Sequence, residues 1–369
     1  MEPTGVFNNY YRNKRVIVTG HTGFKGSWLS LWLAQLGASP AGFSAYLPSN
    51  PCNFEALGLE RLIKHHKGDI RNFHQLNEAF QSFHPEIVFH LAAQPLVRRS
   101  YEEPKLTFDT NVGGTVNVLE CIRQNECVKV AVIITSDKCY KNVEWVWGYR
   151  ENDQLGGDDP YSASKGCAEI AIHSYCQSYF SKENRVYAAS ARAGNVIGGG
   201  DWAEDRIIPD CVRAWAENQP VIIRNPRATR PWQYVLEPLS GYLWLGALLG
   251  SNAIPNGGAF NFGPRADTIQ PVSALLTTFQ KYWDKAQWKV NIESSGKKES
   301  SLLKLCCDKS LSLLKWNAIL SFEEAIEFTA LWYKEFLRAK ENILEFSKQQ
   351  IEQYCSLAKQ RGMEWAKDG

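Results

Sequence analysis

The sequence lacks a strong charge imbalance, a long apolar run and any regular spacing of cysteines. Its 41 basic and 39 acidic residues leave a net charge of +2, too little to attract nucleic acid or an anionic membrane surface. No stretch approaches the ~18 consecutive apolar residues of a membrane helix. The composition therefore favours a globular protein that binds neither nucleic acid nor membranes.

The ten cysteines are scattered, and Cys306 and Cys307 form an adjacent pair rather than a C-x-x-C. This favours reduced thiols packed as small apolar groups over a disulfide framework or a zinc site. The first four residues are polar and include an acid, unlike a signal peptide. We therefore expect a cytoplasmic protein with no bound metal.

What the sequence does contain is an alternation of short apolar runs and helical patterns. Strands are predicted at 15–19, 40–45, 86–91, 128–135 and 185–191. Helices are predicted at 27–33, at 110–121 and from about Tyr161. This alternation predicts an α/β fold with a doubly wound parallel sheet of the Rossmann kind, which binds its ligand at the carboxyl ends of the strands.

The pattern breaks up after about Arg192, where loops rich in glycine, proline and arginine separate short segments. We expect residues 1–191 to form the dinucleotide-binding domain, with a later segment at about 235–263 returning to it. Residues 192–369 should form mainly a smaller mixed α/β lobe that binds the substrate. Within it, 338–365 predicts a charged helix whose apolar stripe serves surface packing or a subunit contact.

The loop Gly20-x-x-Gly23-x-x-Gly26, which includes Phe24, lies between a predicted strand and a predicted helix. Such glycines let the backbone turn tightly and approach a pyrophosphate, while the helix N-terminus supplies free N–H groups. The alternative, a glycine-rich turn alone, does not account for all three spacings. The loop therefore predicts a dinucleotide site.

The acid that usually binds the adenosine ribose about 20 residues beyond such a loop is missing. Ser44 stands in its place, and no adjacent arginine offers a clamp for a 2′-phosphate. NAD is thus favoured over NADP, with loose adenosine binding. Asp69, followed by Ile70, is a candidate to hydrogen-bond the adenine, or else a turn-capping residue.

Tyr161 and Lys165 are four residues apart, so that a helix places them on one side. A nearby ammonium favours the phenolate form of a tyrosine, whose free pKa is about 10. Lys165 can supply that charge while also holding the nicotinamide ribose. Ser136, at the end of a strand, would hydrogen-bond the same substrate hydroxyl. These residues predict hydride transfer at a hydroxyl-bearing carbon.

Asp137 and Lys138 follow Ser136 directly. One interpretation is a solvated charge pair at the strand end, which contributes little. The other is an acid and a base placed for elimination. Once carbon 4 of a sugar is a ketone, the proton on carbon 5 is acidic. Lys138 could then remove that proton while Asp137 protonates the departing carbon 6 hydroxyl.

Several segments resemble the extended short-chain dehydrogenase/reductase family, and within it the sugar-nucleotide 4,6-dehydratases that act on CDP-glucose. The resemblance covers residues 15 to about 337. It is carried by VTGHTGFKGSW (18–28), HLAAQP (90–95), TSDKCY (135–140), RPWQ (230–233) and VLEPLSGY (235–242). The dTDP-glucose enzymes have Asp-Glu where this chain has Asp137-Lys138, so the resemblance makes Lys138 the candidate base.

The resemblance implies that CDP-glucose loses water through an internal NAD redox cycle, giving CDP-4-dehydro-6-deoxyglucose for dideoxy sugars of bacterial O-antigen. It also implies a homodimer or tetramer, formed through the helices near Thr110 and Tyr161. Ala92 and Ala93 would face the nicotinamide. The implied substrate-site residues are Gln94, Asn111 (which supports the catalytic lysine), Asn195, Arg206, Arg224 and Arg230.

Two other functions stay open. A sugar-nucleotide 4-epimerase or 4-reductase would share Tyr161 and Lys165 but would not need Asp137 and Lys138. An inactive dinucleotide sensor or scaffold would not need an intact set of Ser136, Tyr161 and Lys165.

Overall fold

The computed structural model describes residues 5–181, 185–265, 268–283, 286–290 and 303–367. The first four residues, used above to argue against a signal peptide, lie outside that part. The main sheet has seven strands, most of them apolar runs of the sequence. They are β1 (Arg15–Thr19), β2 (Ser39–Ser44), β3 (Lys64–Lys67), β4 (Ile87–His90), β5 (Val130–Ile134), β6 (Tyr187–Ala193) and β11 (Ala259–Phe262).

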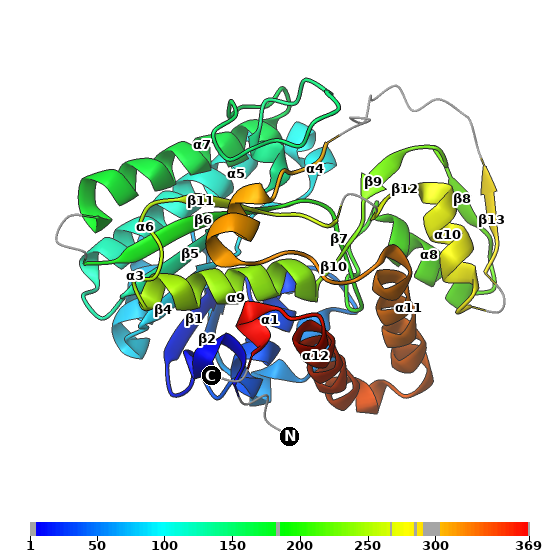
Figure 1. Ribbon diagram of the computed structural model, residues 1–369, viewed down its shortest axis with the longest axis horizontal. Helices are drawn as coiled ribbons and strands as arrows, with labels where there is room; N and C mark the ends of the chain where they lie inside the picture. The colour runs from blue at the N-terminus through cyan, green and yellow to red at the C-terminus, as the bar shows by residue number, and fades with distance from the viewer. Residues whose placement is uncertain (1–4, 182–184, 266–267, 284–285, 291–302, 368–369) are drawn as a thin grey trace.

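Neighbouring strands of this sheet are all parallel, in the order β11-β6-β5-β4-β1-β2-β3. The predicted doubly wound α/β fold is confirmed. The chain order reverses between β1 and β4, which is where a crevice forms at the carboxyl ends of the strands. The last strand, β11, comes from far along the chain and pairs with β6 (Figure 1).

Helices cover both faces of the sheet because successive strand residues point to opposite sides. Val16 and Val18 of β1 join one hydrophobic core, and Ile17 joins the other. The first core includes α1 (Phe24–Gln35), α9 (Leu236–Gly250) and α12 (Ile343–Gln360). The second includes α3 (Phe73–Phe83), α6 (Gly114–Gln124) and α7 (Pro160–Tyr175). Short helices α2 (Asn53–Ala56), α4 (Val97–Glu102) and α5 (Pro104–Phe108) lie in the connections.

A smaller lobe lies to the right of the sheet in Figure 1. In it β8 (Val221–Ile223) pairs with β13 (Trp288–Val290), and β9 (Thr229–Pro231) pairs antiparallel with β12 (Ile269–Pro271). Its helices are α8 (Ile207–Ala216) and α10 (Val272–Gln280), with α11 (Phe322–Arg338) beneath them. A two-residue pairing of β7 (Val196–Ile197) with β10 (Gln233–Tyr234) lies between lobe and sheet.

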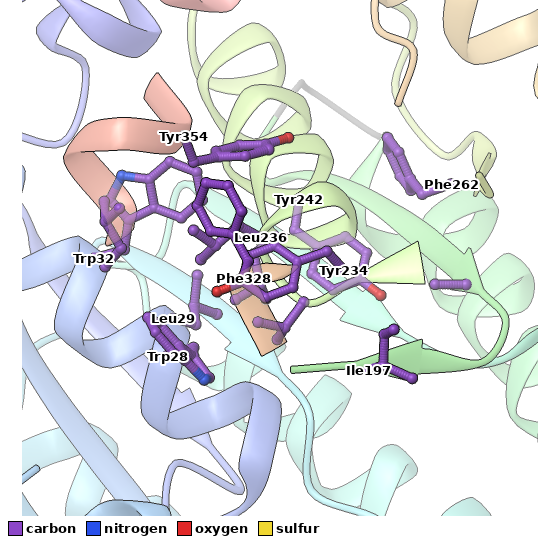
Figure 2. Packing of buried hydrophobic residues seen from close by; sticks show 14 of the residues in the cluster. Trp28, Leu29, Trp32, Ile197, Tyr234, Leu236, Tyr242, Phe262, Phe328 and Tyr354 are labelled. Atoms are coloured by element: carbon purple, nitrogen blue, oxygen red, sulfur yellow. The ribbon is translucent and has the colours of Figure 1, made fainter. Parts of the chain in front are cut away.

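The C-terminal helix differs in two ways from its prediction. It is interrupted at Ala339, where φ is −153°, so α12 begins only at Ile343. Its apolar stripe is buried within the chain: Tyr354 meets Trp32 of α1 edge-on at 5.9 Å, in the aromatic core of Figure 2. The stripe thus serves packing within the chain.

No helix in the described part of the chain is both long and apolar enough to cross a membrane. All ten cysteines are free thiols. Within the described residues, no three His, Cys, Asp or Glu side chains form a group that could hold a metal ion.

Glu237 on α9 is a buried carboxyl group that joins three segments. It accepts hydrogen bonds from the backbone of Ile319 at 2.9 Å and Leu320 at 2.6 Å, and from the Tyr354 hydroxyl at 2.8 Å. Burial raises its pKa to about 7, although these donors oppose the shift. The contact between α9 and α12 therefore contains a carboxyl group whose pKa is raised to about 7.

Replacing Glu237 by glutamine should make the thermal stability less dependent on pH. The pKa of this carboxyl in the folded protein lies above its ordinary value of 4.5. The stability that its neutral form contributes is thus complete below pH 4.5 and lost as pH rises through about 7. Glutamine does not ionise, so calorimetry should show a smaller fall in Tm from pH 5 to 8. Glu345→Gln, on the exposed face of α12, is the control; equal slopes in wild type and Glu237→Gln would contradict the assignment.

Candidate active site

The loop after β1 fits a dinucleotide pyrophosphate. Gly20 has a φ of +74°, and a Cβ there would lie 2.7 Å from the Ala92 backbone nitrogen. A Cβ on Gly26 would lie 2.2 Å from the Gly20 carbonyl oxygen. Gly23 caps α1 without a side-chain hydrogen bond, which leaves the first N–H groups of the helix for an anion. Ala92 and Ala93, half-buried after β4, border the same loop.

At the adenosine end, Ser44 is buried at the end of β2, with its Oγ 3.5 Å from the backbone nitrogen of Thr22. Asp69 is held by Arg71, whose guanidinium lies 2.6 Å away and lowers the pKa of Asp69. A groove of about 720 Å³ runs beside Asp69. Ile70 is buried against Gly114, so it belongs to the wall of this region.

Helix α7 presents Tyr161 and Lys165 from its first two turns. The helix begins there because Asp159 accepts a hydrogen bond from the Ser162 backbone and Pro160 occupies the first position. Tyr161 and Lys165 are 8% and 6% exposed. Ser136, at the end of β5, interacts with the Tyr161 phenol. The structure thus brings together the three residues predicted for hydride-transfer chemistry.

The electrostatics of this group differ from the sequence-based expectation. Burial raises the pKa of Tyr161 to about 12, while the Ser136 hydroxyl and the charge of Arg206 oppose that rise. Lys165 is not among the groups that lower it. Burial instead lowers the pKa of Lys165 to about 8, against the attraction of Glu169. In the protein alone, desolvation outweighs the phenol–ammonium interaction.

Asp137 and Lys138 lie in a single 3₁₀ turn, Asp137–Cys139, directly after Ser136. Asp137 is 6% exposed and accepts a hydrogen bond from the Ser136 hydroxyl at 2.9 Å. Burial raises the pKa of Asp137, although the charges of Lys138 and Lys25 oppose the shift. Lys138 is half-buried. The pair is therefore not a solvated charge pair at a strand end.

The side-chain amides of Gln94 and Asn111 form hydrogen bonds within the protein. The Gln94 amide bonds to the backbone of Leu96 and to Thr107. The Asn111 amide bonds to the Gln94 backbone at 2.8 and 3.1 Å and to Ser164 at 2.9 Å. Asn111 lies in a π-helical segment (Asp109–Gly113) that turns it inward. Both amides are buried and hydrogen-bonded within the protein, so they hold the walls of the site in place.

The predicted arginines lie on the side of the smaller lobe. Arg206 pairs with the buried Asp201 at 2.8 Å and acts electrostatically on Tyr161. Arg224 is exposed and lies 3.9 Å from Asp205. Arg230 is half-buried on β9. Asn195 is exposed between β6 and β7. Arg206 thus acts on the catalytic group from the side of the smaller lobe.

Lys25 is a charged group that the sequence analysis missed. It lies in the first turn of α1, with its Nζ 3.5 Å from the Tyr242 hydroxyl. Its pKa is lowered to about 8 by burial and Arg206, while Asp137 and Asp201 oppose the shift. Phe24 beside it packs against the core. The sequence did offer one indication of this charged group, because Lys25 is a lysine inside a glycine-rich loop that is otherwise uncharged.

This fold, with a dinucleotide loop and a Ser-Tyr-Lys group at the switch point, defines a short-chain dehydrogenase/reductase type of enzyme. The chain belongs to the GDP-mannose 4,6 dehydratase family, whose model matches residues 17–329. Among its relatives is CDP-glucose 4,6-dehydratase of Salmonella typhimurium, 48% identical over 353 residues. The match covers 94% of this chain and 98% of the relative. The resemblance drawn from the motifs is confirmed.

Solved structures share the fold at lower identity. An epimerase from Methanothermobacter thermautotrophicus superposes with a TM-score of 0.77 at 24% identity, over 91% of this chain and 97% of that one. A dTDP-glucose 4,6-dehydratase from Bacillus anthracis, solved in complex with NAD, gives 0.70 at 19% identity, over 87% and 97%. At these identities the likeness concerns the fold.

Replacing Ser44 by aspartate should tighten NAD binding. A carboxylate at the end of β2 can accept hydrogen bonds from a ribose, and a charged hydrogen bond of this kind should lower the Kd for NAD about tenfold. Ser39→Asp, at the exposed opposite end of the same strand, is the matched control. Titration calorimetry measures both variants. An unchanged or weaker Kd in Ser44→Asp would count against this account of the ribose site.

Proposed function

We propose that the protein is an NAD-dependent CDP-glucose 4,6-dehydratase. It converts CDP-D-glucose to CDP-4-dehydro-6-deoxy-D-glucose and water. The observation that carries this proposal is the buried Asp137, next to Lys138 and in hydrogen-bond contact with Ser136 of the hydride-transfer group. The 48% identity to a CDP-glucose 4,6-dehydratase supports the same reaction and the same nucleotide.

The loop of Gly20, Gly23 and Gly26 would hold the cofactor pyrophosphate, and Lys165 the nicotinamide ribose. When bound, NAD would supply the hydride acceptor for carbon 4 and the hydride donor for carbon 6, and its positive ring would favour the phenolate of a nearby tyrosine. Tyr161 takes the proton of the 4-hydroxyl, and Ser136 orients that hydroxyl. Since the redox cycle closes on itself, the site must retain its intermediate and exclude water.

Asp137 and Lys138 carry out the elimination. Lys138 removes the proton from carbon 5, which the ketone at carbon 4 makes acidic. Asp137 gives a proton to the 6-hydroxyl, which leaves as water. The raised pKa of Asp137 suits this role, because an acid must hold its proton at working pH. This pair distinguishes a dehydratase from a 4-epimerase or 4-reductase of the same fold, which has no water to remove.

The cofactor and the sugar nucleotide would bind to different parts of the fold. Residues 1–191, joined by about 235–263, would bind the cofactor, and the remainder of 192–369 would bind the sugar nucleotide. Arg206, Arg224 and Arg230 would provide positive charge for the diphosphate, with Asn195 near the sugar phosphate. The free thiols fit a reducing cytoplasm.

We further propose a homodimer formed through the outer faces of α5 and α7. Ile170 of α7 is 62% exposed, and Phe108 at the end of α5 is 37% exposed. The two helices contact each other, and we take the exposed faces that carry Ile170 and Phe108 together as one apolar strip. Covering it with the same strip of a second copy would remove this surface from water. A tetramer would need a further surface.

Lys138→Met should bind NAD and still exchange hydride at carbon 4, but lose dehydration by at least about 100-fold, because a general base typically contributes that much. Mass spectrometry of an incubation with NAD and CDP-, dTDP-, GDP- or UDP-glucose detects the loss of one water. Lys141→Met, an exposed lysine three residues away, is the control. Full turnover in Lys138→Met would remove the proposed base; water loss from another nucleotide sugar alone would reassign the substrate.

Ile170→Asp should convert the dimer to a monomer, because a charge would be buried in the apolar strip. Sedimentation velocity gives the mass of each form. Leu313→Asp places the same charge at an exposed leucine outside the strip and should leave the dimer intact. A dimer that survives Ile170→Asp, or a wild-type monomer, would rule out this interface.

A further inference from the structure

The segment that carries Ser136, Asp137 and Lys138 is fixed at both ends by one buried ion pair. Glu169 of α7 and Arg192 of β6 lie 2.7 Å apart, and the side chain of each is only 4% exposed. Among the described hydrogen bonds, none joins either residue to the proposed reacting groups, although Glu169 acts electrostatically on Lys165. Neither residue was singled out from the sequence. Their partners, however, stand immediately before and after the catalytic turn.

At the first end, the Thr135 hydroxyl donates a hydrogen bond to Oε1 of Glu169. The other carboxylate oxygen, Oε2, accepts from the Ser190 hydroxyl at 2.8 Å as well as from Arg192. Three donors therefore satisfy the carboxylate, as a buried charge requires. Thr135 directly precedes Ser136, so the end of β5 is tied to α7 at this point.

At the other end, Arg192 donates from Nη1 to the Tyr140 hydroxyl at 2.7 Å. That hydroxyl donates in turn to Oδ1 of Asn261 on β11, also at 2.7 Å. The guanidinium also lies over the Tyr140 ring, 4.9 Å from its centre. Tyr140 comes two residues after Lys138. The turn that carries the acid and the base is thus held between two anchored residues.

The helix that carries the hydride-transfer group carries the anchor too. Tyr161, Lys165 and Glu169 follow one another at intervals of four along α7, which puts them on the same side of the helix. Any shift of the catalytic turn relative to α7 must therefore break a contact to Glu169 or to its partner Arg192. In this way the ion pair fixes one catalytic group relative to the other.

We propose that Tyr140, Glu169 and Arg192 are positioning residues for the elimination step. The inference rests on the proposed dehydratase function and specifies what aligns it. Oxidation at carbon 4 uses Ser136, Tyr161 and Lys165. Elimination also needs Asp137 and Lys138 to reach carbon 6 and carbon 5 of the same hexose. Loosening the Tyr140 end should therefore slow elimination more than hydride transfer.

Tyr140→Phe tests this, because it removes the hydroxyl and keeps the ring beneath Arg192. Water loss should fall about 10- to 100-fold, the range expected from a misplacement of up to ~1 Å. Hydride exchange at carbon 4, followed with deuterium-labelled CDP-glucose, should change little. The readout is the ratio of the rate of water loss to the rate of hydride exchange. General destabilisation would lower both rates together and leave this ratio unchanged.

The matched control is Tyr149→Phe. Tyr149 is buried, stacks on Tyr140 at 5.3 Å and uses its hydroxyl in two hydrogen bonds, to Val143 and Asn142. It has no hydrogen bond with Arg192 among the described contacts. The control should lose comparable stability and keep the wild-type ratio of rates.

A second pair tests the other end and does not depend on the folding of Tyr140→Phe. Thr135→Val removes the hydroxyl that binds Glu169 and should lower the ratio, and Thr135→Ser should restore it. An unchanged ratio in Tyr140→Phe and Thr135→Val, with wild type dehydrating normally, overturns the positioning role alone. A wild-type protein that exchanges hydride but releases no water overturns the proposed function together with it.

Discussion

Parallel pairing of the strands is the constraint on which the site depends. Because β1, β4, β5 and β6 run in the same direction, the residues that follow each of them emerge at one edge of the sheet. The glycine loop, the Ala92–Ala93 backbone and the Ser136–Lys138 turn meet there although they are far apart in sequence. Return of the chain to the sheet at β11 adds Asn261, which anchors Tyr140 from the far side.

Burial sets the acid–base properties at this edge more than pairwise contacts do. It raises the pKa values of Asp137 and Tyr161 and lowers those of Lys25 and Lys165. All four shifts favour the neutral form, as desolvation must. The raised pKa of Asp137 favours the protonated form that an acid needs. The raised pKa of Tyr161 disfavours the phenolate, which the positive charge of a bound cofactor would favour.

The site and the family relationship support one function from independent directions. The 48% identity to a CDP-glucose 4,6-dehydratase supports the proposed dehydration, and the buried Asp137 beside Ser136 supports the proposed acid. The low-identity structural neighbours, which include epimerases and dehydratases alike, add the fold only. Chemistry on a shared fold is decided by the side chains of the site, and our proposal assigns the elimination to Asp137 and Lys138.

The sequence by itself determined five of the seven strands of the sheet, the dinucleotide loop and the candidates for the catalytic group. These follow from local patterns: strand periodicity and the spacing of Gly20 to Gly26 and of Tyr161 to Lys165. It could not reveal that the Gln94 and Asn111 amides are hydrogen-bonded within the protein, that α12 packs on α1, or that Lys25 acts electrostatically on Asp137. Nor could it join Glu169 to Arg192. These depend on contacts between segments distant in sequence, and on burial, which arises only when the helices close over the sheet. Only the tertiary structure therefore decided which charges are desolvated and what holds the catalytic turn in place.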